Sequence, residues 1–166
     1  MRAKLLIVLT TTAAVFIQSA ILAPRAWAGT KYAILHNFGS GKDGSLPSGS
    51  LFMGGDGILY GATSGGDAGC KGGDSGGTVF QLARQADGTW SERLLYCFAG
   101  QWTDGFPDAG VIMDGKGDLF GTSAGGTHDL SNVYELANGA SGWDFSVLYD
   151  LGGGGLLLDG QGDVYG

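Results

Sequence analysis

Three stretches of the chain repeat one short motif, and they decide the fold. They read GDGILYGATSGG at residues 55–66, GKGDLFGTSAGG at 115–126 and GQGDVYG at 160–166. The central glycines Gly57, Gly117 and Gly162 are 60 and then 45 residues apart. Recurrence at this spacing is typical of architectures in which similar units are stacked or arranged around an axis.

The sequence around these stretches repeats as well. The corresponding segments are LHNF at 35–38, LYCF at 95–98 and LYDL at 148–151; GTVFQL at 77–82 and SNVYEL at 131–136; and the Asp-Gly-Pro loops at 43–47 and 104–107. The third copy replaces that loop with four glycines. We therefore divide the chain into repeat units at roughly 31–66, 77–126 and 131–166.

Each unit is predicted to form four short β-strands. In the second unit they cover residues 78–83, 91–98, 110–113 and 118–122, where β-branched and aromatic residues alternate between Gly and Asp turns. Asp87-Gly88 is a hairpin signal between the first two strands. Four strands per unit predict an all-β chain of β-propeller-like blades, with about two and a half blades in residues 29–166. Because each blade buries its apolar face against a neighbour, we also expect self-association to cover open blade faces.

Composition excludes several classes of protein. The chain has 34 glycines, 15% charged residues and 43% hydrophobic residues, which excludes both a helical bundle and a disordered polyelectrolyte. Beyond residue 28 it carries 16 acidic and 6 basic residues, a net charge of −10. Such a surface repels phosphates, so we expect no nucleic-acid partner.

Residues 1–28 are typical of a secretion signal. Arg2 and Lys4 precede an uncharged apolar run at 5–23, and Ala26-Trp27-Ala28 forms a small-x-small cleavage site before Gly29. The alternative is a retained membrane anchor, because a run of about 19 residues is long enough to span a bilayer. We expect export, to the periplasm, the cell surface or the extracellular space.

The repeats resemble the GloVer tandem-repeat family of exported bacterial proteins, which is named for variable C-terminal anchors. The resemblance is carried by LYGATSGG at 59–66, GTVFQLA at 77–83, LLYCFAG with DGFPDAGVIMDGKGDLFGTSAGG within 94–126, and GDVYG at 162–166. It covers nearly all of residues 31–166 and implies a propeller-like surface protein without assigned catalytic residues. The chain departs from the family in its few repeats and in ending before an anchor, which leaves a truncated, non-functional fragment as one expectation.

Gly73-Asp74-Ser75-Gly76-Gly77 resembles the nucleophile loop of chymotrypsin-like serine proteases. That chemistry also needs a histidine base and an aspartate that orients it. The only histidine upstream of Ser75 is His36, which occupies the repeat position of Tyr96 and Tyr149 and is therefore expected to pack. A glycine-rich loop between strands is the favoured interpretation.

Two pairs of carboxylates recur at one repeat position, Asp114 with Asp118 and Asp159 with Asp163. Calcium prefers such oxygen ligands, and a propeller-type hydrolase or lyase with a calcium site is the alternative function. The same pairs also suit the two carboxylates of a glycosidase. Asp-Gly hairpin turns explain the pattern without a metal, so we expect no cofactor unless calcium binds.

Binding residues are expected on the loops between strands, at 65–77, 99–108 and 125–132. The candidates are Trp102, which is suited to stack on a sugar or a protein partner, its neighbour Asp104, and His128. A solvated loop histidine is the alternative for His128. Cys70 and Cys97 are the only cysteines, and an exported chain permits a disulfide between them.

These observations predict an exported, acidic repeat protein without catalysis of its own. We expect a binding or structural role at the cell surface or outside the cell, with a carbohydrate or protein ligand. Every candidate catalytic residue named above also has an explanation in its repeat position.

Overall fold

The computed structural model describes residues 32–39, 43–66, 76–100, 103–126, 130–150 and 153–166. In these ranges the chain forms antiparallel β-sheets and no helix, which confirms the all-β prediction. It follows that none of the described segments is a helix suited to crossing a membrane. The secretion signal predicted at 1–28 lies outside the described residues.

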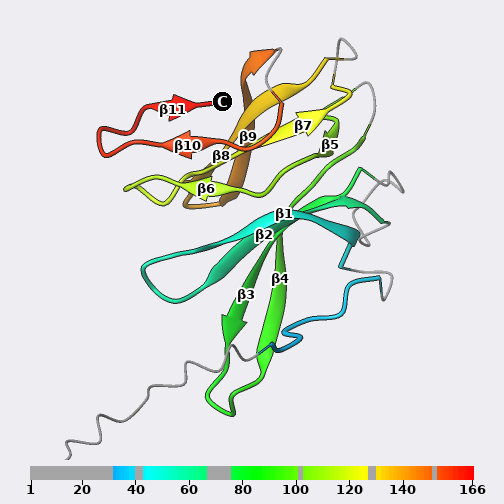
Figure 1. Ribbon diagram of the computed structural model, residues 1–166, viewed down its shortest axis with the longest axis vertical. Helices are drawn as coiled ribbons and strands as arrows, with labels where there is room; N and C mark the ends of the chain where they lie inside the picture. The colour runs from blue at the N-terminus through cyan, green and yellow to red at the C-terminus, as the bar shows by residue number, and fades with distance from the viewer. Residues whose placement is uncertain (1–31, 40–42, 67–75, 101–102, 127–129, 151–152) are drawn as a thin grey trace, which may run out of the picture. The chain divides into compact units, whose positions relative to one another are not determined.

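The first sheet has the strand order β1-β2-β3-β4 (Figure 1). Its strands are β1 (Ser45–Met53), β2 (Leu59–Gly65), β3 (Thr78–Arg84) and β4 (Trp90–Cys97). The β3–β4 connection is the predicted Asp87-Gly88 hairpin, closed by a hydrogen bond from the Gln85 N–H to the Thr89 carbonyl at 2.8 Å. Gly88 takes a φ of +87°, a conformation that favours glycine.

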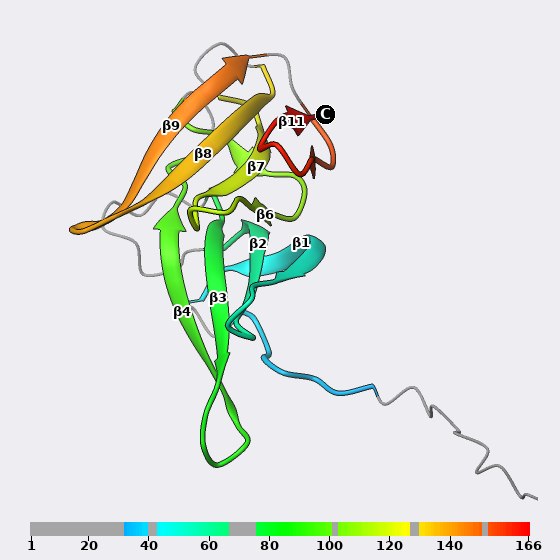
Figure 2. The ribbon, with the colours of Figure 1, turned by 90° about the vertical axis from the view of Figure 1, so that its left-hand side faces the viewer.

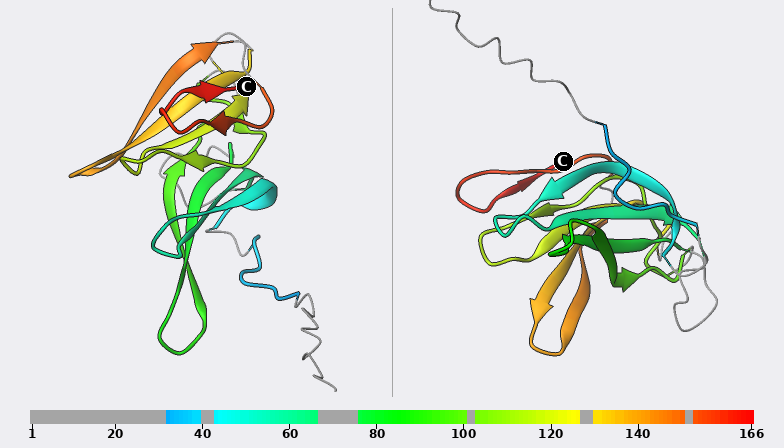
Figure 3. Two further views of the ribbon diagram at one scale, coloured as in Figure 1. Left: turned by 60° about the vertical axis from the view of Figure 1, so that its left-hand side comes forward. Right: turned by 90° about the horizontal axis from the view of Figure 1, so that it is seen from below.

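The second sheet repeats this order with β5 (Phe106–Pro107), β6 (Ile112–Met113), β7 (Leu119–Ala124), β8 (Asn132–Gly139) and β9 (Gly142–Asp150). Both β5 and β6 pair with β7, so together they correspond to the single strand β1. A two-stranded hairpin follows, made of β10 (Leu157–Leu158) and β11 (Val164–Tyr165). Figure 2 shows the long β3–β4 and β8–β9 hairpins, and Figure 3 shows their turn ends diverging.

The sheets do not begin where the predicted repeat units begin. The strands expected to form one four-stranded unit divide between two sheets: β3 and β4 belong to the first, and β6 and β7 to the second. Each sheet therefore joins the end of one unit to the start of the next. The reason is that a repeated sequence can be divided into units at any point of its period. The hydrogen bonds between strands decide which strands form one sheet. The sheets are not closed.

The main core lies between the two sheets. The first sheet contributes the buried side chains of Tyr60, Val79 and Phe98, and the second contributes Leu119, Tyr134 and others. A smaller cluster on the opposite face of the first sheet, Leu59, Phe80 and Leu82, is covered by Leu35 and Phe38. Two pairs of corresponding strands meet, since β4 contacts β9 and β6 contacts β10, and β2 also contacts β5. The sheets thus stack in the order in which they occur along the chain.

Glycines in β2 and β7 let an aromatic ring lie flat on the sheet. Gly61 is opposite Phe80, and Gly121 is opposite Tyr134. A methyl group on Gly61 would lie 2.6 Å from the Phe80 ring, and one on Gly121 would lie 2.5 Å from Cζ of Tyr134. The repeated aromatic-glycine dipeptide therefore has a packing role in both sheets.

Candidate functional site

The described flanks of the predicted binding loops come together at one end of the sheets. The Gly76 N–H donates to the Phe98 carbonyl at 3.2 Å, and the Gly76 backbone packs against Gly100. Gly105 packs in the same way against the Ala124 backbone. The described segments near residues 76, 100, 103–105 and 124–126 thus lie beside one another, and we refer to them as the loop end.

Asp104 organises the centre of the loop end. One carboxylate oxygen accepts hydrogen bonds from the N–H groups of Ala99 at 2.8 Å and Gly100 at 3.1 Å, and the other accepts from the Tyr96 hydroxyl at 2.8 Å. The side chain is buried, with 4% of its surface exposed. Burial first, and then the Asp104 carboxylate, raise the pKa of Tyr96, so this phenol stays protonated and donates. Predicted as a binding residue, Asp104 is held inside the loop it stabilises.

Asp43 repeats this arrangement in the preceding copy. Its Oδ2 lies 2.8 Å from Nε2 of His36, and its Oδ1 accepts from the Gly39 N–H at 3.2 Å. His36 takes the place of Tyr96 as the partner of the aspartate. The ring of His36 also makes an edge contact with that of Phe38, at 4.6 Å between centroids, which confirms the packing role expected for His36.

A buried polar pair supports each of these loops from below. In the first sheet the hydroxyl groups of Thr63 and Thr78 are 2.9 Å apart. In the second sheet Nδ2 of Asn132 lies 3.4 Å from Oγ of Ser123, which also donates to the Asp104 carbonyl at 2.7 Å. All four side chains are fully buried. The buried polar side chains next to the loop end are therefore hydrogen-bonded, and they do not form an exposed group of reactive side chains.

The inner strands surround a second feature, a cavity of about 440 Å³. Three corresponding segments of the repeats line it, around Leu51, Val111 and Leu156. Asp108 is its acidic residue, and the carboxylate accepts a hydrogen bond from the Thr122 hydroxyl. The Thr122 hydroxyl lies 2.7 Å from the carbonyl of Gly154 as well. This cavity is mostly apolar, with one carboxylate that is already engaged.

The candidate metal ligands lie in hairpin turns. Oδ1 of Asp114 accepts from the N–H groups of Lys116 and Asp118, and Oδ1 of Asp118 accepts from the Asn138 N–H at 2.8 Å. Asp159 accepts from Gln161 and Asp163 in the same geometry. These backbone donors, first Asp163 and then Gln161, hold the pKa of Asp159 below its usual value. Within the described residues no group of three or more metal-ligating side chains comes together.

Several predicted residues fall outside the described ranges. They are Trp102, His128, Ser75 and Cys70. Cys97, in β4, is disulfide-bonded, and Cys70 is the only other cysteine in the sequence. Because Cys70 is not described, its bridge to Cys97 stays a prediction. The loop roles of Trp102 and His128 stay predictions for the same reason.

The pairing of Asp43 with His36, and that of Asp104 with Tyr96, was not predicted from the sequence. The signal was present, because each aspartate precedes the glycine of the Asp-Gly-Pro loop and each partner occupies the same repeat position. The pairing needed the loop to fold back on the strand before it, and sequence spacing alone does not show this. No protein-family model, curated protein or solved structure matched the chain.

Proposed function

We propose that the chain is an exported binding module of propeller-type blades, which holds its ligand at the loop end and performs no catalysis. The observation that carries this proposal is the use of the recurring carboxylates. Asp43 and Asp104 are buried, and each accepts a hydrogen bond from a backbone N–H group a few residues earlier, that of Gly39 or Ala99. Carboxylates that accept hydrogen bonds from the nearby backbone fix the shape of a loop. The side chains on the outside of the loop can then contact a ligand.

The propeller-type arrangement is supported by the order in which the sheets stack. The corresponding strands β4 and β9 meet, as do β6 and β10, and three corresponding inner segments line one cavity. Both features are expected of blades around an axis. The resemblance to the GloVer repeats supports the same arrangement and a place outside the cytoplasm.

The ligand class that the loop end favours is a carbohydrate. Trp102 stands two residues before Asp104 in the sequence, and an aromatic ring at this position is suited to stack on a sugar. The net charge of −10 beyond residue 28 disfavours acidic polymers. A neutral glycan therefore fits better than a nucleic acid or an anionic polysaccharide.

Export is tested by producing the full chain in bacterial cells and sequencing the N-terminus of the product from each cell fraction. We expect a periplasmic or secreted product that begins at Gly29. A product that keeps Met1 and stays in the cytoplasm would contradict the proposal.

Binding is tested by probing a glycan array with the exported chain. We expect neutral glycans to bind, and binding to be lost in Trp102→Ala. The matched control is Thr89→Ala, in the exposed β3–β4 turn. Equal binding by both variants would contradict ligand binding at the loop end. Release of shortened glycans would show that the protein is an enzyme.

A further inference from the structure

A hollow with polar walls lies between the first sheet and the turn of the β8–β9 hairpin. Its volume is about 380 Å³, within the range of about 300–1,000 Å³ that is typical of small-molecule sites. The side chains that line it come from β2, β3, β4 and the β8–β9 hairpin, and they are Tyr60, Gln81, Arg93, Asn138, Ser141 and Trp143. Figure 2 shows the turn end of this hairpin next to β4. We refer to the space between these side chains as the polar hollow.

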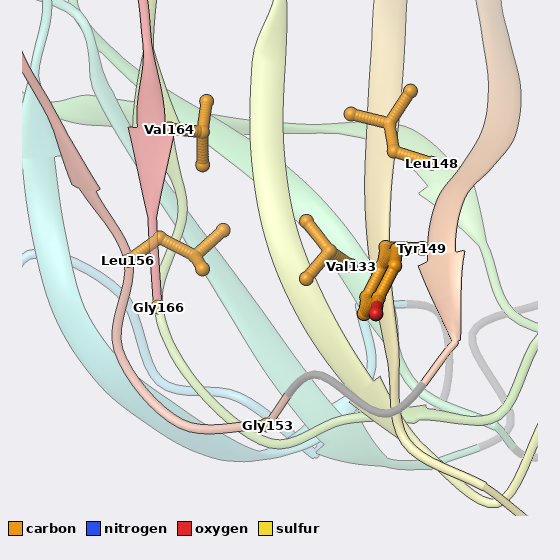
Figure 4. Close-up of a pocket in the computed structure, with 7 residues that line it drawn as sticks. All are labelled: Val133, Leu148, Tyr149, Gly153, Leu156, Val164 and Gly166. Carbon is orange, nitrogen blue, oxygen red and sulfur yellow. The ribbon is translucent and has the colours of Figure 1, made fainter.

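The hollow between the second sheet and the β10–β11 hairpin is of a different kind (Figure 4). Its volume is similar, at about 350 Å³, but the side chains around it are Val133, Leu148, Tyr149, Leu156 and Val164. Such a lining gives a ligand few polar side chains with which to fix its orientation. The polar hollow, by contrast, offers a guanidinium group, two amides and two hydroxyl groups beside an indole ring. The polar hollow is therefore the better candidate for a site with a defined ligand.

The polar residues that the first sheet contributes do not follow from the repeat. Tyr60, Gln81 and Arg93 lie opposite one another across β2, β3 and β4. The corresponding row of the second sheet is Phe120, Glu135 and Ser146. That row has no phenol, no amide and no guanidinium group. Packing that is common to both sheets therefore does not account for these three side chains.

The polar side chains of the hollow are available to a ligand. Within the described residues, Gln81, Arg93 and Asn138 make no side-chain hydrogen bond, and no carboxylate forms an ion pair with Arg93. Arg93 and Asn138 are exposed and Gln81 is half-buried, so water solvates these groups in the free protein. A ligand that enters the hollow therefore replaces water and breaks no hydrogen bond between described side chains.

The two aromatic residues of the hollow are part of the main core. Tyr60 is buried, and Trp143 packs against the same cluster. Burial, and next the nearby Asp56 carboxylate, raise the pKa of Tyr60, so its hydroxyl stays protonated and is able to donate. Rings that core packing already holds in place lose little conformational freedom when a ligand packs on them.

The charges around the hollow favour a ligand with one negative charge. Arg93 is the only charged residue among the described residues that line it. Two carboxylates flank the site, since Asp56 acts on Tyr60 and Asp118 accepts a hydrogen bond from the Asn138 N–H at 2.8 Å. The guanidinium group matches a single carboxylate. A phosphate or a polyanion brings further negative charge, which the flanking carboxylates repel.

We propose that the polar hollow binds a single sugar unit that carries one carboxylate, a hexuronic acid. The planar Arg93 guanidinium matches the two carboxylate oxygens and donates a hydrogen bond to each. The amides of Gln81 and Asn138 both donate and accept, which suits neighbouring sugar hydroxyl groups. Trp143 supplies an apolar ring on which the sugar packs. The polar hollow shares no residue with the loop end, so this site does not depend on the glycan binding proposed there.

The test is isothermal titration calorimetry of the exported chain with glucuronate and with glucose. We expect glucuronate to bind about tenfold or more tightly than glucose, because hydrogen bonds between charged groups are stronger than those to hydroxyl groups. Arg93→Gln should lose this preference. The matched control is Arg84→Gln, which removes the same charge from an exposed position of β3 outside the hollow, and it should bind glucuronate like the unmodified chain.

Further ligands show which part of the molecule is recognised. Acetate that binds as tightly as glucuronate would overturn the sugar, and tighter binding of glucose 6-phosphate would overturn the carboxylate. No binding of glucuronate, or equal affinities of Arg93→Gln and Arg84→Gln for it, would overturn the site.

Two variants separate this site from the loop end. Trp102→Ala should leave glucuronate binding unchanged, and Arg93→Gln should leave the binding of neutral glycans at the loop end unchanged. Loss of glucuronate binding in Trp102→Ala would place the acidic sugar at the loop end and overturn the assignment to the polar hollow. Failure of neutral glycans to bind would contradict the proposed function and leave the polar hollow unaffected.

Discussion

The hydroxyl of Tyr134 is a polar group that the core does not satisfy. The side chain is completely buried, its oxygen has no hydrogen-bond partner among the described residues, and burial raises the pKa of the phenol. Phe80 occupies the same repeat position in the first sheet and packs over Gly61 without a hydroxyl. Burial of the Tyr134 hydroxyl therefore has a desolvation cost that the corresponding residue Phe80 does not have.

We predict that Tyr134→Phe raises the free energy of unfolding by about 1 kcal/mol, since it removes an unpaired buried hydroxyl. Urea denaturation measures the change. The control is Tyr96→Phe, which removes a hydroxyl that donates to Asp104 and should lower stability by about 1–2 kcal/mol. If both variants lost stability equally, the Tyr134 hydroxyl would have a partner after all.

Glu92 is a second residue that the fold tolerates at a cost. It occupies the repeat position of Phe145, and one of its carboxylate oxygens is buried with no hydrogen-bond partner in the part of the chain that the structure describes. Burial is the main cause that raises the pKa of Glu92; Asp43 adds to the rise and His36 opposes it. The folded chain therefore holds this proton at pH values where the unfolded chain has already released it.

The contribution of Glu92 to the free energy of unfolding therefore falls as the pH rises from about 4.5, the ordinary pKa of this group, through the raised pKa that Glu92 has in the folded chain. We predict that Glu92→Gln, which cannot ionise, gains stability relative to the unmodified chain between pH 4 and pH 7. Urea midpoints of both proteins at each pH give the difference and cancel the other titrating groups. A difference that does not change with pH would contradict this assignment.

At the scale of the strands, the aromatic-glycine dipeptides fix how β2 and β7 pack. The contact of Gly121 with the Tyr134 ring leaves no room for a methyl group, whereas Gly115 in the β6–β7 turn has no atom within 4 Å of that position. We predict that Gly121→Ala lowers the free energy of unfolding by about 1–3 kcal/mol through overpacking. Gly115→Ala should be close to neutral. Thermal or urea denaturation of both variants checks this, and equal losses would contradict the packing role.

Elements that depend on local sequence were predicted well. The strands β3, β4 and β7 begin and end within two residues of the predicted ranges, and the Asp87-Gly88 hairpin forms as expected. Turn chemistry and alternation are encoded in neighbouring residues, so a single sequence reveals them. The division of strands between sheets, and the pairing of Asp104 with Tyr96, depend on long-range contacts that alternation does not encode. Trp102 and His128 lie outside the described residues, so this part of the site stays a prediction.

At the scale of the whole described unit, residues 33–166, stability should be distributed along the stack. In repeat architectures each unit is stabilised mainly by its nearest neighbours. The first and second sheets share one core, so these two sheets support each other. The β10–β11 hairpin has two residues in each strand and one neighbouring sheet. It therefore has far fewer contacts to lose when it opens.

We predict a gradient of hydrogen exchange that follows this order. Amides of β3 and β8, which pair on both sides and carry the fully buried Val79 and Tyr134, should exchange last and through global unfolding. Amides of β10 and β11 should exchange first, through local opening. Exchange measured by mass spectrometry on the chain at low concentration, where copies do not associate, checks the order. If β10 and β11 exchanged together with β3, the whole stack would open as one cooperative unit, and the nearest-neighbour description would be wrong.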